Sequence, residues 1–536
     1  MREETWRQKR VYSEEKLQLA RLALEAIRNG LDVRSAMRQY PLPEGGFLGK
    51  HALVKVYHQL VESGEWDEDS ALLAKIRMKP GRTLSGVTTV TVLTKPYPCP
   101  GECIFCPTEI DMPQSYLSDE PGAMRGLQNN FDPFRQVSVR LQALYEVGHP
   151  TEKVELLVLG GSWSAYPRDY QEWFIRRCFD ALNEFNPDDS VDGDNLIQAQ
   201  SRNENSAHHN VGLVVETRPD LITVEELSWY RYLGVTKVQI GAQSLDDRIL
   251  KLNKRGHTVA QTLDAMVLLR AGGFKVVLHW MPNLLGATLE SDQTDFARIW
   301  ESNSLNPDEL KIYPCQLLKN ADLYQNWQKG EYHPYSETEL RDLIADLKET
   351  IPRYCRVNRI IRDIPSPHIV AGNRNSSLRQ DIQVEMKRRG TKCQCIRCRE
   401  VRRQAVKLAD LVLDDLVYHA AYAEEHFLSY NTSQDQLAGY LRLSLPDKDN
   451  LLGLPDLSGA AIIREVHVYG QSLGLGAEQN GAAQHIGLGT NLIERAEKIA
   501  REKGFPRLAV IAAVGTRQYY AARGFIMGEL YMLKGL

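Results

Sequence analysis

The sequence predicts an α/β protein of several domains: a small helical N-terminal region, an open (β/α)6 barrel and a C-terminal α/β domain. The chain has 536 residues, more than one compact core holds. Between residues 85 and 315, six short β-branched runs alternate with longer amphipathic stretches, which is typical of a parallel sheet with right-handed crossovers. A second set of strands, with a glycine-bearing loop that opens a helix, follows residue 436. We divide the chain into a helical N-terminal region (1–80), the barrel (81–320), a linker with a basic, cysteine-bearing loop (321–410) and the C-terminal domain (411–536).

Composition limits the class of protein. Hydrophobic residues at 43% and charged residues at 25% are ordinary for soluble globular proteins. No apolar run approaches the length that spans a bilayer, and the N-terminus lacks the apolar segment of a signal peptide. Six of the nine cysteines fall in two tight clusters, which is metal-site usage rather than disulfide usage. We therefore expect a cytoplasmic protein without a membrane partner.

Residues 1 to about 80 have a helical pattern. Apolar residues recur at nearly helical spacing over 14–28, which ends at Asn29-Gly30, and again over 52–62. Lysines and arginines are scattered through the region. They are compatible with a solvated helical surface and with a module that contacts RNA.

Three cysteines, Cys99, Cys103 and Cys106, directly follow the β-branched run 87–93. The run predicts a buried strand, so the thiols lie on the loop that leaves its C-terminal end. Thiolates are the usual ligands of iron–sulfur clusters, and three of them leave one iron of a four-iron cluster open. The alternative is a structural zinc site that a fourth ligand completes elsewhere.

The spacing Cys-x3-Cys-x2-Cys after a first barrel strand resembles the signature of the radical S-adenosylmethionine (SAM) enzymes. The resemblance implies a [4Fe–4S] cluster whose open iron holds the amino and carboxylate groups of SAM and delivers the electron that cleaves it. It also implies an open (β/α)6 barrel.

Candidate SAM ligands follow the expected strands, because ligands of parallel sheets gather at the C-terminal strand ends. Gly160-Gly161 follows the second strand and resembles the glycine motif of the family for the SAM amino group. Glu216 and Arg218 follow the third strand as possible ligands of the ribose and carboxylate, and Gln239 lies on the fourth. A glycine turn, a helix N-cap region and a core glutamine would give the same sequence pattern without binding SAM.

The barrel is expected to have six strands, each followed by a helical stretch. The expected strands are 87–93, 154–159, 211–216, 237–240, 275–281 and 310–313, and the expected helices 169–183, 224–233, 258–271, 291–300 and 336–350.

The most basic part of the chain lies between residues 374 and 407, with eleven Lys or Arg against three acidic residues. A charge run is usually a solvated face, but arginine dominates here and the run surrounds a thiol cluster, which favours a surface for phosphates. The candidate contacts to such phosphates are Arg374, Arg379, Lys387, Arg388, Arg389, Lys392, Arg397 and Arg399.

The cluster itself, Cys393, Cys395 and Cys398, offers three ligands for a tetrahedral zinc ion. Cys315 is the candidate fourth ligand, since it is a loop-end cysteine after the sixth strand and has no other assigned role. Cys355 and His368 are rivals.

The C-terminal domain is expected to have strands at 437–445, 460–468 and 508–513 and a helix at 491–503. A loop that opens a helix is a ready pyrophosphate site, because unpaired N–H groups and the helix dipole converge there. Its pattern Gln-x2-Gly-x-Gly resembles the coenzyme A loop of the GNAT acetyltransferases, and Tyr519-Tyr520-Ala-Ala-Arg-Gly-Phe resembles their second motif, a tyrosine near the coenzyme A sulfur. The resemblance assigns acetyl-CoA to Val468, Gln484, His485, Ile486, Gly487, Leu488, Gly489, Thr490, Tyr519 and Tyr520.

A radical SAM barrel followed by a GNAT domain is similar to the catalytic subunit of Elongator, including its stand-alone bacterial and archaeal forms. The resemblance runs from about residue 75 to the C-terminus. It includes Glu216-Thr-Arg-Pro-Asp, Leu252-Asn-Lys-Arg-Gly-His-Thr, Arg362-Asp-Ile-Pro and Val466-His-Val-Tyr-Gly. Eukaryotic members carry extra upstream cysteines that this chain lacks, and the basic Cys-x-Cys-x2-Cys is not kept in every member.

The resemblance implies modification of wobble uridine 34 in the anticodon stem-loop of tRNA. A 5′-deoxyadenosyl radical would take hydrogen from the methyl of acetyl-CoA, the carbon radical would add to C5 of the uridine, and thioester hydrolysis would leave a carboxymethyl group. Both sites must share a shielded pocket, which the base enters by leaving its stack. Tyr519 or Tyr520 would orient the thioester or its water. A reductant is required, and the protein is expected to be a monomer or homodimer.

Other functions remain open at this point. A protein lysine acetyltransferase would use the GNAT domain and keep SAM as a structural ligand. A methylthiotransferase-like RNA enzyme would hold iron–sulfur clusters at both cysteine sets. A non-enzymatic RNA-binding scaffold would not turn over SAM.

Overall fold

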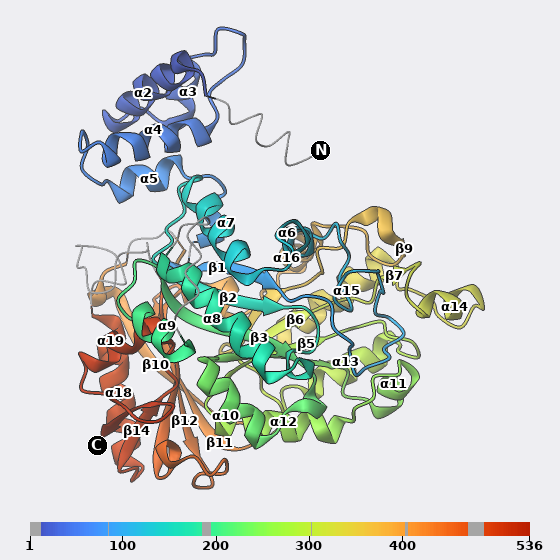
Figure 1. Ribbon diagram of the computed structural model, residues 1–536. Helices are drawn as coiled ribbons and strands as arrows, with labels where there is room; N and C mark the ends of the chain where they lie inside the picture. The colour runs from blue at the N-terminus through green and yellow to red at the C-terminus, as the bar shows by residue number, and fades with distance from the viewer. Residues whose placement is uncertain (1–11, 84, 185–194, 302, 403–405, 470–486) are drawn as a thin grey trace.

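The computed structural model describes residues 12–83, 85–184, 195–301, 303–402, 406–469 and 487–536. It confirms the predicted fold class, an α/β protein with an open parallel sheet and a second C-terminal sheet (Figure 1). A helical bundle at the N-terminus stands apart from both. Within these residues, no helix is both long and apolar enough to cross a membrane.

The N-terminal bundle has a core of its own, which includes Ala20, Leu24, Leu53 and Tyr57. It joins the rest of the molecule beside the end of helix α7 (Pro133–Tyr145), where the ring of His58 stacks on Tyr145 with centroids 4.0 Å apart. The helices are α2 (Glu14–Arg28), α3 (Val33–Gln39), α4 (Lys50–Glu62) and α5 (Ser70–Ile76).

The central sheet has seven parallel strands in the order β1-β2-β3-β4-β5-β6-β8. The first six lie where the β-branched runs predict them. The seventh, β8, lies inside the expected linker, and its residues Arg-Val-Asn-Arg carry one apolar side chain. The strands are β1 (Thr88–Leu93), β2 (Lys153–Leu159), β3 (His209–Thr217), β4 (Lys237–Gln243), β5 (Lys275–Trp280), β6 (Glu309–Ile312) and β8 (Arg356–Arg359).

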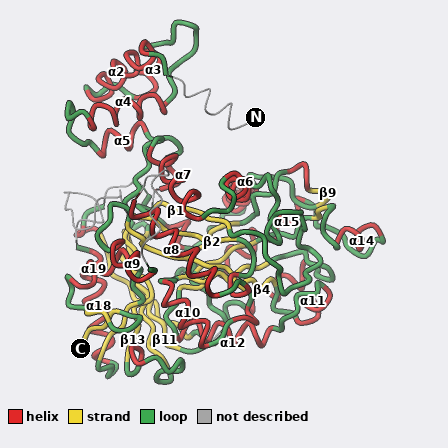
Figure 2. The backbone as a smooth tube through the Cα atoms, in the orientation of Figure 1, coloured by secondary structure: helices red, strands yellow, loops and turns green. Residues whose placement is uncertain are grey.

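Helices surround the strands (Figure 2). Capping boxes at Thr258 and Ser336 explain where α12 and α15 begin. The helices of this part are α6 (Pro121–Gln128), α7 (Pro133–Tyr145), α8 (Arg168–Glu184), α9 (Leu196–Asn203), α10 (Val224–Leu233), α11 (Asp247–Leu252), α12 (Val259–Ala271), α13 (Leu289–Arg298), α14 (Leu323–Gln328), α15 (Glu337–Thr350), α16 (Leu378–Arg388) and α17 (Ile396–Arg399). A separate sheet of two short antiparallel strands, β7 (Leu317–Leu318) and β9 (Ile369–Ala371), completes this part of the molecule.

The C-terminal domain is a second seven-stranded sheet in the order β10-β11-β12-β13-β14-β16-β15. Strands β13 and β14 are parallel and pair only from Ala460 to Ile463, after which β13 continues beside β12 alone and the two strands part. The elements are β10 (Leu411–His419), β11 (Ala423–Thr432), β12 (Leu437–Pro446), β13 (Ala460–Val468), α18 (Leu488–Glu502), β14 (Arg507–Val510), α19 (Arg517–Ala521), β15 (Ile526–Met527) and β16 (Met532–Gly535).

The C-terminal domain packs against the N-terminal ends of the central strands. Arg464 of β13 pairs with Asp308, directly before β6, and donates to the carbonyl of Phe274, directly before β5. Gly515 lies so close to the start of β3 that a Cβ there would be 2.7 Å from the backbone nitrogen of Asn210. The cysteine loop leaves the other end of the sheet, and a strand of six residues spans about 20 Å. The two predicted sites therefore lie at opposite ends of one sheet.

Candidate active site

A cavity of about 1230 Å³ connects the two ends of the central sheet. Cys99, Cys103 and Cys106 line it at one end, and Tyr520 of the C-terminal domain lines it at the other. Between them it is lined by charged side chains that pair with one another: Lys237 with Glu155 at 2.5 Å, and Lys275 with Glu309 at 3.0 Å. The cysteine loop and Tyr520, which the sequence predicts as parts of separate sites, thus line one cavity.

The cysteine loop surrounds a nearly buried thiol, Cys103, which Arg255 approaches with Nη1 at 3.1 Å from Sγ. A hydrogen bond from Cys106 lowers the pKa of Cys103, burial opposes the shift, and the Arg255 charge adds to it. Cys99 Sγ lies 3.5 Å from the N–H of Gly101, which donates to it. The loop can therefore stabilise thiolate, the form that binds metal.

Arg218 offers an unused hydrogen-bond donor to this loop. It is 3% exposed, its Nε donates to Asp220 at 3.0 Å, and its Nη2 donates to the carbonyl of Arg255 at 2.8 Å. Its Nη1 is buried without a partner among the described residues and lies against Gly101, where a Cβ would collide with it. An orphaned guanidinium nitrogen beside three thiols fits a ligand that carries a carboxylate.

The two glycines after β2 have different surroundings. Gly160 has φ 138°, and a Cβ there would collide with Thr94 Oγ1, so its missing side chain serves the packing of β1 on β2. Gly161, with φ 97°, lines the cavity and would meet only the carbonyl of Gln114 at 3.8 Å. The structure therefore places Gly161, and not Gly160, beside space for a ligand.

Glu216 lines the cavity, whereas Gln239 does not. Burial raises the pKa of Glu216, and Lys311 opposes the shift. Gln239 is buried and accepts hydrogen bonds from Lys311 Nζ and from His279 Nε2, the latter at 3.0 Å. Gln239 thus positions Lys311 and His279, which line the cavity in its place.

Sequence reasoning missed several cavity residues, among them Arg255, Lys311, His279, Gln243 and Arg362. Arg255 and Arg362 stand in stretches that resemble the family, but the resemblance assigned them no role. Gln243 ends β4 with φ 69°, a left-handed conformation that a non-glycine residue rarely adopts and that often marks functional sites.

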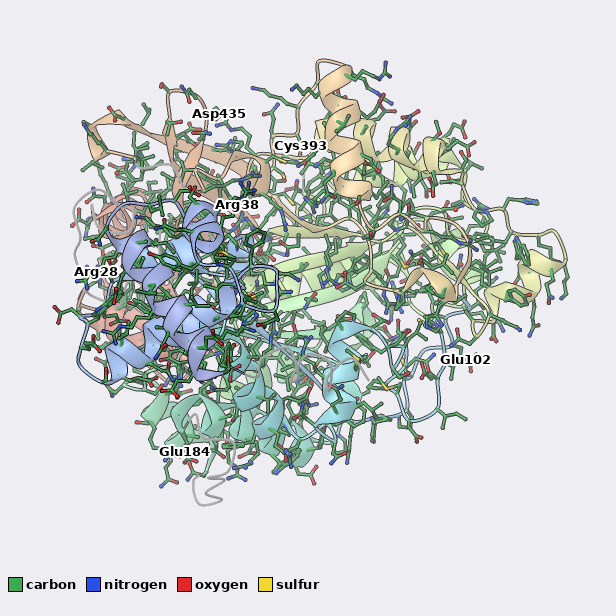
Figure 3. All side chains as sticks on the ribbon, turned by 90° about the horizontal axis from the view of Figure 1, so that it is seen from above. Arg28, Arg38, Glu102, Glu184, Cys393 and Asp435 are labelled. Atoms are coloured by element: carbon green, nitrogen blue, oxygen red, sulfur yellow. The ribbon has the colours of Figure 1, made fainter. Side chains whose placement is uncertain are left out.

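The second cysteine set is compact: the sulfur atoms of Cys393, Cys395 and Cys398 all lie within 4.8 Å of one another. The buried Lys348 places Nζ 4.0 Å from Cys398 Sγ, a positive charge beside the thiols. In the view of Figure 3, Cys393 is well separated from Glu102 of the cysteine loop, so the two sets are distinct sites.

The structure does not bring Cys315 to this set. Cys315 lines the large cavity and packs with Ile104, Leu317 and Tyr332, and burial raises the pKa of its thiol to about 12. Cys355 is the nearer rival, because its carbonyl accepts the N–H of Ile396 at 2.9 Å. His368 pairs with Asp119 instead.

Helix α18 begins with backbone N–H groups and an arginine side by side. Gly487 has φ 74°, and a Cβ on Gly489 would lie 2.5 Å from Tyr519 Oη. Thr490 Oγ1 accepts a hydrogen bond from Arg523 Nη2 at 2.9 Å. Such a helix start suits a phosphate. Val468 ends β13 beside it, and Leu488 is buried; Gln484, His485 and Ile486 lie outside the described residues.

The two candidate tyrosines point to different places. Tyr520 is 7% exposed, lines the large cavity and packs edge to face on Phe525. Tyr519 lies against Gly489 and under Arg523, whose guanidinium carbon is 3.6 Å from the ring centroid. Burial raises the pKa of Tyr520, so its hydroxyl keeps its proton.

The candidate tRNA residues do not form one uniform surface. Arg374, Lys387, Arg388 and Lys392 are exposed, although Arg374 donates to the carbonyl of Val370 at 2.7 Å and Arg388 pairs with Glu385 at 2.7 Å. The other four are less exposed and have partners within the protein: Arg389 pairs with Glu385 at 2.6 Å, Arg379 donates to the carbonyl of Val357, Arg397 to that of Asn358, and Arg399 to Asn431.

Known proteins resemble the chain over most of its length. Residues 97–295 match the Radical SAM superfamily, and residues 307–388 match the Radical_SAM C-terminal domain. The chain is 40% identical over 493 residues to the tRNA uridine(34) acetyltransferase of Methanocaldococcus jannaschii, covering 89% of this chain and 90% of that protein. It is 41% identical to the protein of that name from Dehalococcoides mccartyi (85% and 99% covered) and 36% identical to Elongator complex protein 3 of Homo sapiens (87% and 87%). The solved structure of archaeal Methanocaldococcus infernus Elp3 with an N-terminal deletion matches with a TM-score of 0.73 at 34% identity, covering 85% of this chain and all of that one.

Proposed function

Since the chain belongs to the radical SAM family of tRNA uridine(34) acetyltransferases and Elongator complex protein 3, we propose that it places a carboxymethyl group on C5 of wobble uridine 34 in tRNA. The observation that carries the proposal is the single cavity lined both by Cys99, Cys103 and Cys106 and by Tyr520. A radical and its target must meet at van der Waals distance in a place that excludes water, and a shared cavity meets that need.

The end of the cavity at the cysteine loop is the proposed place of a [4Fe–4S] cluster and SAM. Cys99, Cys103 and Cys106 would hold the cluster, and the free Nη1 of Arg218 would receive the SAM carboxylate near Gly161. Bound there, the pair would supply the radical that activates the methyl of acetyl-CoA. Arg255 offsets the thiolate charge at Cys103.

The start of α18 is the proposed place of the acetyl-CoA diphosphate, with Arg523 as a second donor. The gap beyond Ile463, where β13 and β14 part, would admit the thioester arm. Because the two ends of the sheet are about 20 Å apart, the thioester arm must extend through the cavity for the reacting groups to meet. Tyr520, which faces the cavity with its proton retained, would donate a hydrogen bond to the thioester carbonyl during hydrolysis.

Zinc is the proposed occupant of Cys393, Cys395 and Cys398. Their loop would steady the exposed Arg374, Lys387 and Lys392 for contact with tRNA phosphates, and the N-terminal bundle would add further contacts.

The test is an anaerobic reaction of the reconstituted protein with tRNA, SAM, acetyl-CoA and a reductant, followed by mass spectrometry of the nucleosides. We expect carboxymethyluridine, lost when acetyl-CoA is omitted. The triple variant C99A/C103A/C106A should form no 5′-deoxyadenosine. Tyr520→Phe should lower the product at least tenfold, and Tyr519→Phe, its neighbour outside the cavity, should have the smaller effect. A wild-type protein that leaves uridine unmodified, or that carries two iron–sulfur clusters and no zinc, would contradict the proposal.

A further inference from the structure

Three arginines from separate elements meet on one lip of the large cavity. Arg82 lies in the turn Pro80–Thr83 before β1, Arg125 in α6 and Arg140 in α7, and all three line the cavity. We call Arg82, Arg125 and Arg140 the lip arginines. Across the described part of the chain, no carboxylate comes within 4.0 Å of any of them. Arg125 donates only to the carbonyl of Pro121, at 2.6 Å.

The lip arginines repel one another. Burial lowers the pKa of Arg140 to about 10, and the charges of Arg125 and Arg82 contribute to this shift. Burial also lowers the pKa of Arg125, again with a contribution from Arg82. Guanidinium groups gathered in a half-buried place without counter-charge cost free energy, which a bound anion would recover.

A carboxylate lies nearby but is already engaged. Glu120, directly before α6, lines the same cavity and pairs with Arg362 at 3.1 Å. Other arginines that line this cavity have carboxylate partners as well: Arg218, Arg356 and Arg359 pair with Asp220, Glu400 and Asp363. Among the described residues, the chain leaves the lip arginines without one. This selectivity points to a ligand that brings its own negative charge.

The position of the lip indicates what kind of anion it receives. Strands β1 and β8 are the two edges of the open sheet, and the cavity is lined from both sides of the opening between them. The lip arginines lie on the β1 side, and Arg397 and Arg402 line the cavity on the β8 side. Positive charge on both sides of an opening suits an extended polyanion that crosses it and turns one unit inward.

Coenzyme A is the other source of phosphate in this protein, but its proposed site has its own donors. The start of α18 and Arg523 lie in the C-terminal domain, whereas the lip arginines belong to the turn before β1 and to the two helices that follow it. Planar guanidinium groups match the phosphates of a nucleic-acid backbone, which repeat along the strand.

We infer that Arg82, Arg125 and Arg140 bind a backbone phosphate of single-stranded RNA, adjacent to the nucleotide whose base enters the cavity between β1 and β8. The identity of the RNA, an anticodon loop, rests on the proposed function. The phosphate site itself rests on the unpaired charges and their place at the opening.

The experiment titrates a labelled anticodon stem-loop RNA with the full chain at two salt concentrations. R125Q/R140Q should bind at least tenfold more weakly than wild type, with a salt slope shallower by about 0.7 for each phosphate that the variant no longer neutralises. The matched control K498Q/K503Q removes two positive charges from exposed lysines at the end of α18, and should stay within twofold of wild type. Acetyl-CoA binding and thermal unfolding report whether the variants are folded.

Equal RNA affinity and equal salt slope for R125Q/R140Q and K498Q/K503Q would overturn the inference. Loss of acetyl-CoA binding with RNA binding retained would overturn it too, because the site would then serve coenzyme A. Should R125Q/R140Q unfold, Arg125→Gln and Arg140→Gln decide the question singly by the same titration. RNA binding is independent of chemistry, so wild-type protein that binds RNA through these arginines but leaves uridine unmodified would refute the proposed function and support the inference.

Discussion

The buried arginines between the two sheets differ from the lip arginines in their partners as well as in their burial, since Arg82 is exposed and Arg125 and Arg140 are half-buried. Arg464 donates from both of its terminal nitrogens, Nη2 and Nη1, to the carboxylate of Asp308 at 2.6 and 2.9 Å. Its Nη2 also lies 3.0 Å from Glu425. Arg270 faces Glu425 at 3.2 Å, and Arg442 faces Glu465 at 2.9 Å. We call Arg270, Arg442 and Arg464 the interface arginines. Each has a carboxylate supplied by the chain itself, whereas the lip arginines have none among the residues that the structure describes.

The pKa shifts follow from this difference. Burial alone would raise the pKa of Asp308, but Arg464, Arg442 and Arg270 together lower it. At the lip, no carboxylate of the described chain opposes burial, and the pKa of Arg140 falls. The interface arginines, which carboxylates of the chain neutralise, hold the two domains together. The lip arginines lack such carboxylates and are available to bind a ligand.

The largest expected effect is at the interface. Asp308→Asn leaves Arg464 and Arg442 buried beside a neutral group, and we expect the free energy of unfolding to fall by about 3–5 kcal/mol. Urea unfolding measures it. The control is Asp363→Asn, which removes a half-exposed partner of Arg359 and should cost less than about 1 kcal/mol. Equal losses in the two variants would remove the distinction between paired buried and paired exposed arginines.

The interface should also respond to acid. Burial raises the pKa of Glu465, but Lys275 and Arg442 outweigh it and lower the pKa to about 2, against about 4.3 in an unfolded chain. A lowered pKa stabilises the fold above about pH 4.3, and this contribution, on the order of 3 kcal/mol, is lost as the pH falls towards 2. Unfolding measured from pH 6 to pH 3 should therefore show a shallower dependence for Glu465→Gln than for wild type. Superimposable pH profiles would contradict the assignment.

The stabilisation that bound RNA gives to the fold should be the next largest effect, and it should depend on the lip arginines. Stem-loop RNA at 100 times the wild-type Kd should stabilise wild type by about 2.7 kcal/mol, and a variant that binds tenfold more weakly by about 1.4 kcal/mol. R125Q/R140Q should show the smaller gain, and K498Q/K503Q the larger one. Unfolding with and without RNA provides the measurement, and the same gain in both variants would count against the lip as an RNA site.

The smallest effect has the opposite sign. Arg140→Gln relieves repulsion at the lip, so without RNA its free energy of unfolding should stay the same or rise by up to about 1 kcal/mol. Arg442→Gln, the matched change at the interface, should lose about 3–5 kcal/mol. A loss of more than about 1 kcal/mol in Arg140→Gln would show that Arg140 is a structural residue.

The sequence was sufficient for elements with a strong pattern. The six β-branched strands and the capped helices α12 and α15 lie where they were predicted, because local preference and tertiary position agree there. Strand β8 was missed because one valine among Arg356, Asn358 and Arg359 gives no apolar run. Strand β10 was missed because it is an edge strand with Asp414 and Asp415 at its centre.

Individual contacts were less predictable than elements. The glycine pair after β2 was identified, but only the fold shows that Gly160 accommodates Thr94 while Gly161 lines the cavity. Cys315 and Cys393 were expected to share one zinc site, and the fold places them in different clusters. Arg82, Arg125 and Arg140 form no motif, since their proximity arises only when three elements pack together.

The docking of the C-terminal domain on the N-terminal strand ends has a consequence for how the protein is made. Arg464 follows its partner Asp308 by 156 residues, so a ribosome completes the central sheet long before the second sheet exists. Until then, Asp308 lacks its partners Arg442 and Arg464, and water can solvate its carboxylate at little cost. The dehydration of Asp308 is deferred to the moment of docking, when these two arginines arrive on the preformed sheet. Synthesis can therefore proceed through a hydrated half-molecule, and closure of the cavity becomes the final event in the maturation of the chain.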